Sequence, residues 1–294
     1  MKKLIGRNLG VVAILIAALV WGCIGLFSRA LGEAGFSPVQ TVTVRSFFTV
    51  LFVLGFLLIK NPKALRIRPR DIWIFIGTGI CSFMFFNICY MNSIEQNSLS
   101  VACILMYTSP FWVFLLSPIL FKEKNTLFGF LALCIAFGGS VMVCLTSSVS
   151  LTGNGLLYGI LSGFGYALYS IFGKIASKKY SSITTIFYTF LFSFIAIVPF
   201  SHPAHLVSLL AAEPSNLLLS VSISIINTIL PYTLYTYGLS KVSAGKASVI
   251  SIIEPVAAAV VGFLAFGEAI TFVSVCGMGL VLVGLVLYEK LSRV

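Results

Sequence analysis

The succession of long apolar stretches is the feature that most constrains the fold of this chain. A helix crosses a bilayer with about 20 apolar residues, and the chain carries ten such stretches in a row, separated by short polar loops. Only 9% of the residues are charged, whereas a soluble domain has about 25%. We therefore predict an all-α integral membrane protein with ten transmembrane helices. The predicted spans cover residues 9–31, 38–59, 72–91, 98–121, 127–146, 155–174, 183–200, 216–237, 246–268 and 270–288.

The two halves of the chain carry the same pattern at one constant spacing. Glu268 follows Glu123 by 145 positions, and a mid-span proline, a tyrosine, a serine, an alanine and two glycines recur at that spacing. A gapless spacing of this kind indicates an internal duplication. Because each half holds five spans, an odd number, the second half enters the membrane from the opposite side. The duplication is thus predicted to be an inverted repeat, as in many secondary transporters. The repeats are residues 9–146 and 155–288.

The basic residues lie at every second loop, and this pattern predicts the orientation. The net charge of +11 could suggest nucleic acid, but apart from Arg45 the lysines and arginines lie at the chain ends or in and beside the short loops between spans. Such a distribution marks the cytoplasmic side of a membrane protein. We predict a multi-pass protein of the plasma membrane, in bacteria the cytoplasmic membrane, with both termini cytoplasmic and no nucleic-acid partner.

Residue types that carry enzyme or metal chemistry are sparse. All seven cysteines fall in apolar spans without a CxxC pair, which favours small buried side chains over metal ligands. The two histidines, His202 and His205, lie in a loop without acidic ligands at metal spacing. We expect no metal, no cofactor and no enzymatic activity.

Two charged residues lie well inside predicted spans, namely Arg45 and Glu254. Charges at membrane depth are costly and usually mark a substrate or ion path. In one interpretation the two residues bind opposite ends of a charged or zwitterionic solute, or Glu254 carries a coupling proton. In the other they form a salt bridge with each other or bond to the backbone, and only fix the helix register.

Prolines stand in the middle of two matched spans, at Pro110 and Pro255. Because proline has no N–H group, the carbonyls of Met106 and Ser251 lose their helical partners. The prolines are predicted to kink or break their helices. The breaks either line a site and act as hinges, or are static kinks that help the bundle pack.

Several polar and aromatic side chains are candidates for lining a substrate site. Polar residues recur every three or four positions in span eight and in the matching span three, which places them on one helix face. The aromatic candidates could form a wall or a cage for an ammonium group, while ordinary packing and interhelical hydrogen bonds are the alternatives. The candidates are Trp21, Asn87, Tyr107, Tyr166, Asn227, Tyr232 and Tyr235.

Two matched segments carry a family resemblance. They read TSPFWVFLLSPILFKE, ending at Glu123, and IEPVAAAVVGFLAFGE, ending at Glu268, and a glycine-rich apolar helix follows each. This pattern resembles the EamA-type repeat of the drug/metabolite transporter superfamily. The resemblance implies two inverted five-helix repeats around a central cavity, with the two glutamates at helix ends in an architectural role. The first repeat departs from the pattern with Ser109 in place of a glutamate, and with Lys122 where the family often has glycine.

The resemblance also implies a function. Glu254 before Pro255 is similar to the second repeat of amino-acid-exporting members, so we expect a secondary transporter that exports an amino acid or related polar metabolite by alternating access. Proton coupling, exchange and facilitated diffusion all stay open, as do a monomer and a homodimer. A lipid scramblase and a non-transporting membrane assembly subunit are the alternative functions.

Overall fold

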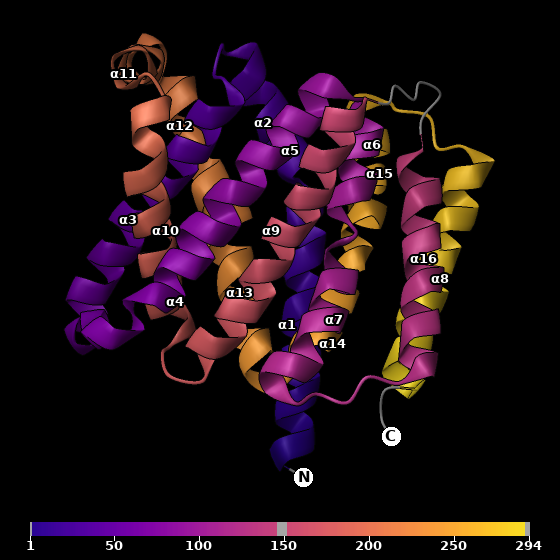
Figure 1. The fold of residues 1–294 in the computed structure, drawn as a ribbon. Helices are drawn as coiled ribbons and strands as arrows, with labels where there is room; N and C mark the ends of the chain where they lie inside the picture. The colour runs from indigo at the N-terminus through magenta and orange to yellow at the C-terminus, as the bar shows by residue number, and fades with distance from the viewer. Residues whose placement is uncertain (1, 146–151, 292–294) are drawn as a thin grey trace.

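The structure, a computed structural model, describes residues 2–145 and 152–291, and every regular element in these residues is a helix (Figure 1). The predicted end of the first repeat at residue 146 lies outside the described residues. The elements of the first half are α1 (Lys2–Gly22), α2 (Ile24–Glu33), α3 (Pro38–Lys60), η1 (Pro62–Leu65), η2 (Pro69–Asp71), α4 (Ile72–Ile76), η3 (Gly77–Met84), α5 (Phe85–Gln96), α6 (Leu99–Met106), α7 (Ser109–Phe121) and α8 (Leu127–Cys144).

The second half again forms five spans, with a short helix between spans 7 and 8. Its elements are α9 (Gly153–Ser177), α10 (Ser182–Ile197), η4 (Val198–Phe200), α11 (Pro203–Ala212), α12 (Pro214–Ser224), η5 (Ile225–Ile229), α13 (Leu230–Lys241), α14 (Ala244–Ile250), η6 (Ser251–Ile253), α15 (Glu254–Phe266) and α16 (Phe272–Leu291). The short helix α11 occupies what the sequence pattern indicated as a loop, because Pro203 starts a helix there at its first position.

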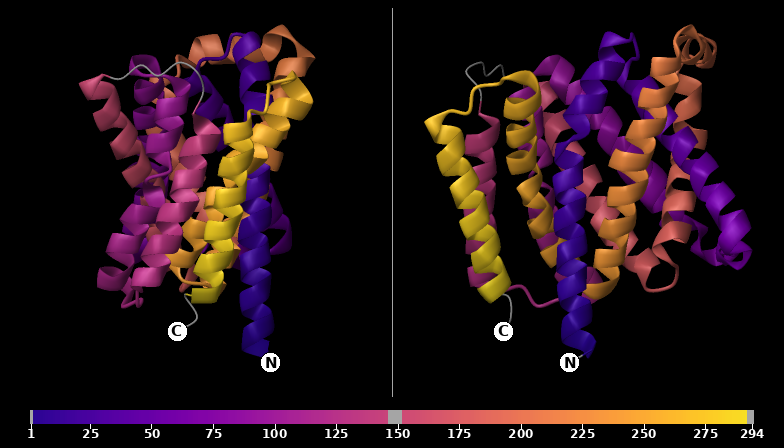
Figure 2. Two further views of the ribbon diagram at one scale, coloured as in Figure 1. Left: turned by 90° about the vertical axis from the view of Figure 1, so that its right-hand side faces the viewer. Right: turned by 180° about the vertical axis from the view of Figure 1, so that it is seen from behind.

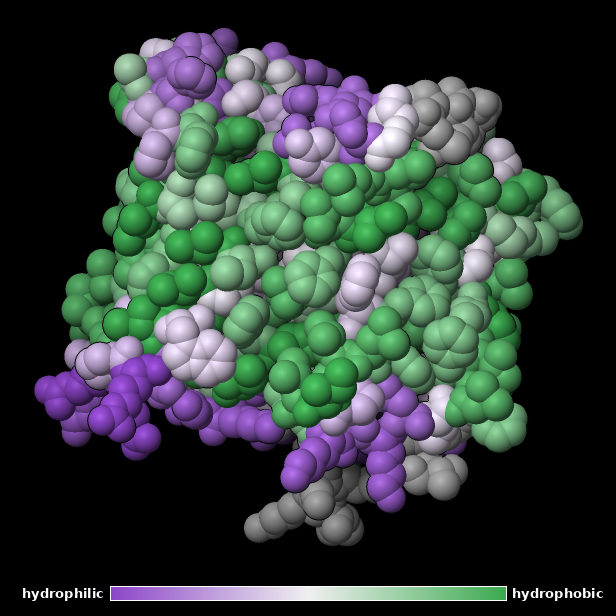
Figure 3. All heavy atoms as spheres, in the orientation of Figure 1, coloured by the Kyte–Doolittle hydropathy of each residue, from purple (hydrophilic) through white to green (hydrophobic). Residues whose placement is uncertain are grey.

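These elements form ten spans, which confirms the predicted fold class. The described residues contain ten helical stretches that are long and apolar enough to cross a membrane. On the face shown in Figure 3 a belt of hydrophobic side chains surrounds the middle, and hydrophilic side chains gather at the two ends. The exposed side chains of the belt include Leu115 and Ile119. Such a surface suits the hydrocarbon of a bilayer, so the chain is a multi-pass membrane protein.

The two repeats run in opposite directions, as an inverted repeat requires. Helix α1 starts and α16 finishes at one end of the bundle, which we call the terminal end, while α9 starts at the opposite, far end (Figures 1 and 2). Span 5 (α8) and span 10 (α16) lie side by side at one edge of the bundle. Their backbones meet where a Cβ on Gly139 would strike the Gly277 carbonyl and a Cβ on Gly284 would strike Ala136. Small residues of this kind permit close helix packing in membranes.

Several spans are interrupted near the middle. Span 1 breaks at Cys23, span 4 between α6 and α7, and span 9 at the 3₁₀ turn η6. Spans 3 and 8 instead contain π-helical segments, η3 and η5, at matched places in the two repeats. Such irregular turns are found frequently at functional sites.

The prolines lie at these breaks, but one predicted consequence is wrong. Pro110 and Pro255 each occupy the first turn of a new helix, α7 and α15. The carbonyl of Ser251 does not lose its partner, since the N–H of Glu254 donates to it and closes the 3₁₀ turn. The chain therefore compensates for the missing proline N–H by tightening the turn, a common arrangement at helix ends.

The turns after spans 4 and 9 have the same backbone conformation but different residues. Lys122 directly follows α7 and Gly267 directly follows α15, and both residues adopt the left-handed conformation, with φ of 56° and 66°. Glycine adopts this conformation without steric cost, whereas other residues pay about 1–2 kcal/mol. The glycine of the second repeat is thus explained by backbone geometry, and Lys122 is strained.

Replacing Lys122 with glycine is expected to stabilise the protein by about 1 kcal/mol, because glycine relieves that strain. The converse change, Gly267→Ala, is expected to destabilise it by a similar amount. Thermal unfolding of the detergent-solubilised variants measures both. Lys124→Gly removes the same charge at a neighbouring residue without positive φ, and a matching gain there would contradict the backbone explanation.

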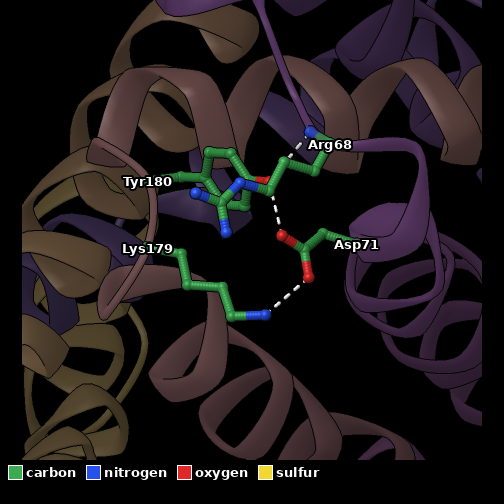
Figure 4. A network of polar contacts seen from close by, with 4 residues as sticks. All are labelled: Arg68, Asp71, Lys179 and Tyr180. Atoms are coloured by element: carbon green, nitrogen blue, oxygen red, sulfur yellow. Dashed lines mark hydrogen bonds and ion pairs between the residues drawn. The ribbon is translucent and has the colours of Figure 1, made fainter.

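A polar network fixes the basic loop that follows span 2 (Figure 4). Asp71 is bonded through one carboxylate oxygen to Lys179 Nζ at 2.5 Å and through the other to the Tyr180 hydroxyl at 2.7 Å. The N–H of Arg68 donates to the same hydroxyl at 3.1 Å. Burial raises the pKa of Tyr180 above its usual range, which keeps its hydroxyl protonated as the donor to Asp71. The network joins spans 2–3 of the first repeat to spans 6–7 of the second.

Candidate functional site

Glu254 lies where the interruptions of spans 1 and 9 meet. It is the first residue of α15, directly after the turn η6, and its side chain is half-buried. The Tyr166 hydroxyl, from the continuous helix α9, donates to its carboxylate at 3.2 Å. On another side, a Cβ on Gly22 would lie 2.9 Å from the Glu254 carbonyl. Because Gly22 is the last residue of α1, the breaks of spans 1 and 9 pack against each other at the backbone of Glu254.

Aromatic rings fill the centre of the bundle next to Glu254. Trp21 is the hub, with ring centroids at 6.3 Å from Tyr166, 5.0 Å from Tyr232 and 5.3 Å from Tyr235. The rings of Tyr232 and Phe83 lie a further 5.8 Å apart. These five residues, which we call the aromatic cluster, come from spans 1, 3, 6 and 8. Four of the predicted candidates are therefore brought together in contact.

Three further tyrosines, Tyr235, Tyr107 and Tyr90, belong to the surroundings of Glu254. The Tyr235 hydroxyl shares a hydrogen bond of 2.7 Å with Ser170. Tyr107, at the break of span 4, and Tyr90 lie within electrostatic range of the Glu254 carboxylate. Tyr90, which matches Tyr235 in the first repeat, lies on the polar face predicted for span 3 but was not one of the named site candidates.

Arg45 lies on the opposite side of the aromatic cluster. Its Nε donates to the Thr228 hydroxyl at 3.0 Å, and its guanidinium stands 5.5 Å over the ring of Phe83. Its side chain is buried. Tyr232 interacts electrostatically with both Arg45 and Glu254. Among the side chains that the structure describes, no ion pair includes either charge, so the direct salt bridge considered from the sequence is not formed.

The two asparagines bond to backbone carbonyls. Asn87 Nδ2 donates to the Phe83 carbonyl in its own span at 2.7 Å. Asn227 Nδ2 donates to the Val20 carbonyl at 2.5 Å, next to the break in span 1. The carbonyl oxygen of the fully buried Asn227 side chain has no hydrogen-bond partner among the residues that the structure describes. Asn227 thus supports the bend that brings Trp21 and Gly22 to the site.

Sequence reasoning missed the residues that hold the candidates in place. Thr228, Phe83 and Ser170 are of types that occur throughout a membrane bundle, so only the fold reveals their contacts. For Thr228 a signal existed, because it adjoins Asn227 on the polar face of span 8. Within the described residues no three histidine, cysteine or acidic side chains gather as a metal site would need.

Comparison with known proteins decides the family. The model of the EamA-like transporter family matches residues 8–145 and again residues 153–289. The chain belongs to the EamA-like transporter family. An uncharacterized transporter of Archaeoglobus fulgidus is 28% identical over 278 residues, with 95% of each chain covered. The uncharacterized inner membrane transporter YicL of Salmonella typhimurium is 22% identical over 292 residues, covering 97% of this chain and 96% of its own.

The fold of this EamA transporter also occurs in a solved structure. A crystal structure of a protein with 16% sequence identity superposes with a TM-score of 0.80 and covers 97% of both chains. At that identity the likeness shows the fold alone. The membership makes the protein a transporter, and its helices place its centre within the bilayer.

Proposed function

We propose that this EamA transporter exports a small zwitterionic metabolite, an amino acid or close relative, across the plasma membrane by alternating access. The observation that carries the proposal is the carboxylate of Glu254 at the start of α15, within hydrogen-bond distance of Tyr166, whose ring in turn lies against that of Trp21. A carboxylate together with electron-rich rings provides both the opposite charge and the cation–π contact that an ammonium group needs.

Arg45 supplies the complementary charge for a carboxylate. Arginine binds carboxylates in two-pronged geometry, and among the described side chains Arg45 is hydrogen-bonded through its Nε to Thr228. The aromatic cluster separates it from Glu254, so a compact solute does not bridge both charges in this conformation. We assign Glu254 to the ammonium end, and Arg45 to the carboxylate end when the helices rearrange during transport. Export follows the likeness of the Glu254-Pro255 pair to amino-acid-exporting members of the family.

A thermal-shift screen on detergent-purified protein tests this assignment. A ligand at 100 times its dissociation constant adds about 2.7 kcal/mol to the stability of the native state. Three matched sets are compared: L-amino acids, the amines that lack their carboxylate, and the carboxylic acids that lack their ammonium group. We expect amino acids to raise the unfolding temperature most, and amines to keep part of that shift.

Two variants test which end of the ligand Glu254 and Arg45 each bind. Glu254→Gln is expected to abolish the shift by amines, and Arg45→Gln to reduce the shift by amino acids to that of the matching amine. Glu213→Gln, on the surface beside Ser215, serves as the control and should respond as wild type. Equal stabilisation of wild type and Glu254→Gln by every effective compound would contradict the assignment.

A further inference from the structure

Two acidic and two basic residues occupy equivalent positions in the repeats. Glu268 follows Glu123 by 145 positions, and Lys174 follows Arg29 by the same number. Each glutamate comes directly after a left-handed residue that ends a helix, α7 in the first repeat and α15 in the second. An exact inverted repeat would give the two glutamates identical contacts at opposite ends of the bundle.

At the terminal end Glu123 joins the first repeat to the second. Its carboxylate oxygens accept the backbone N–H groups of Ala244 at 3.0 Å and Gly245 at 3.4 Å, at the start of α14. A carboxylate is favourable at this position because the first N–H groups of a helix lack partners within the helix. Helix α7, which leads to Glu123, packs against α14. The end of span 4 is thereby fastened to the start of span 9.

Lys174 completes the contact at the same turn. Its Nζ donates to the carbonyls of Leu239 at 2.6 Å and Val242 at 2.5 Å, at the end of α13. Its charge also interacts with that of Glu123. Thus the carbonyls that end span 8 and the N–H groups that begin span 9 are each bonded to a charged side chain.

At the far end the described residues show no equivalent bond between Glu268 and the start of α6. Glu268 forms an ion pair with Arg29 instead, and both side chains are 49% exposed. The described helices α15 and α6, the equivalents of α7 and α14, have no extensive contact with each other, whereas α7 and α14 do. Leu99, which begins α6, is 57% exposed, whereas its counterpart Ala244 is 0% exposed. The end of span 4 is therefore hydrogen-bonded to the start of span 9 at the terminal end. At the far end, the end of span 9 and the start of span 4 are separated.

We propose that Glu123 and Glu268 are paired gate residues, which bind the starts of spans 9 and 4 alternately. The proposal rests on the alternating-access mechanism of the proposed function, but not on the identity of the solute. In the opposite state Glu268 leaves Arg29 and accepts the N–H groups of Leu99 and Ser100, while Glu123 releases α14. Arg29 then binds the carbonyls of Ile94 and Asn97, which correspond to the two that Lys174 binds here.

The gates act by positioning helices, so removing one should change the balance between the two states. A hydrogen bond to a charged group contributes enough for its loss to change an equilibrium roughly tenfold or more. Glu123→Ala removes the bonds to Ala244 and Gly245 that close the terminal end in the present state. It should therefore favour the opposite state, in which the far end is closed. Glu268→Ala should leave the present state dominant, and it should cancel the change when combined with Glu123→Ala.

Spin-label distances at the two ends measure this balance without any solute. One label pair is placed at Lys124 and Ser240 at the terminal end, and a second at the equivalent Glu95 and Ala269 at the far end, all four exposed. The labels are introduced in a variant whose seven native cysteines are replaced and whose thermal unfolding matches wild type. With Glu123→Ala we expect a longer distance at the terminal pair and a shorter one at the far pair.

Two results would overturn the proposal. In one, Glu123→Ala lowers the unfolding temperature but leaves both distance distributions unchanged, as a purely structural helix cap would. In the other, the shift persists unaltered in the double variant. If Glu123→Ala does not fold, Glu123→Gln, whose single oxygen can keep one of the two bonds, should give a smaller shift in the same direction. Glu33→Ala, an exposed acid at the end of α2, is the control and should shift neither pair.

Discussion

Glutamine in place of Glu254 is expected to reduce amino-acid transport by roughly 10- to 100-fold, the factor that corresponds to losing a hydrogen bond to a charged group. The substitution preserves the size of the side chain and its bond to Tyr166, so the helix break and the aromatic cluster should remain. What disappears is the negative charge that holds the ammonium group. Initial rates in proteoliposomes, at equal amounts of folded protein, measure the effect.

Tyr166→Phe separates the charge of Glu254 from its orientation. It removes the hydroxyl that donates to the carboxylate but leaves the ring beside Trp21. We expect a loss smaller than that of Glu254→Gln, with a raised KM. Wild-type rates in Glu254→Gln, or an equal loss in the surface control Glu213→Gln, would show that the carboxylate does not bind the solute.

Alanine at Gly22 is expected to destabilise the protein by about 1–3 kcal/mol, the usual cost of overpacking. The added Cβ would lie 2.5 Å from the Ala257 side chain and 2.9 Å from the Glu254 carbonyl. Either α15 or the end of α1 must then move, which would displace Glu254 from Tyr166. Thermal unfolding and transport should therefore decline together.

The matched control lies three residues away, in α2. A Cβ on Gly25 would meet nothing within 4 Å, and alanine in a helix is favoured over glycine by about 0.5–1 kcal/mol. Gly25→Ala is thus expected to be neutral or stabilising. If Gly22→Ala and Gly25→Ala lost stability and transport equally, the effect would come from the flexibility of the break in span 1. The close approach of that break to span 9 would then not be its cause.

The fold was largely predictable because the bilayer dictates it. Span length follows from membrane thickness, and the five-span repeat with its constant spacing predicted the inverted arrangement. What the sequence pattern missed are local details: helix α11 between spans 7 and 8, the π-helical segments η3 and η5, and the satisfied Ser251 carbonyl. These depend on hydrogen bonds that several nearby turn types can satisfy equally, so residue types alone do not select among them.

The site was predictable in its members but not in their arrangement. Membrane depth drew attention to Arg45 and Glu254, and four aromatic candidates do meet at Trp21 or beside it. A distance between two charges on different spans depends on helix packing, however, and the sequence left a direct salt bridge open. The structure instead places the aromatic cluster between them, with Thr228 as the partner of Arg45.

The most direct test of the account compares solute and lipid movement by the same purified protein. Wild-type protein is reconstituted into liposomes loaded with the amino acid that gives the largest thermal shift. Counterflow of the labelled amino acid and translocation of a fluorescent phospholipid are then followed in parallel. The account predicts amino-acid counterflow by the wild-type protein that is lost in Glu254→Gln. It also predicts lipid movement no faster than in liposomes without protein. Lipid translocation without counterflow would contradict it and would identify a scramblase.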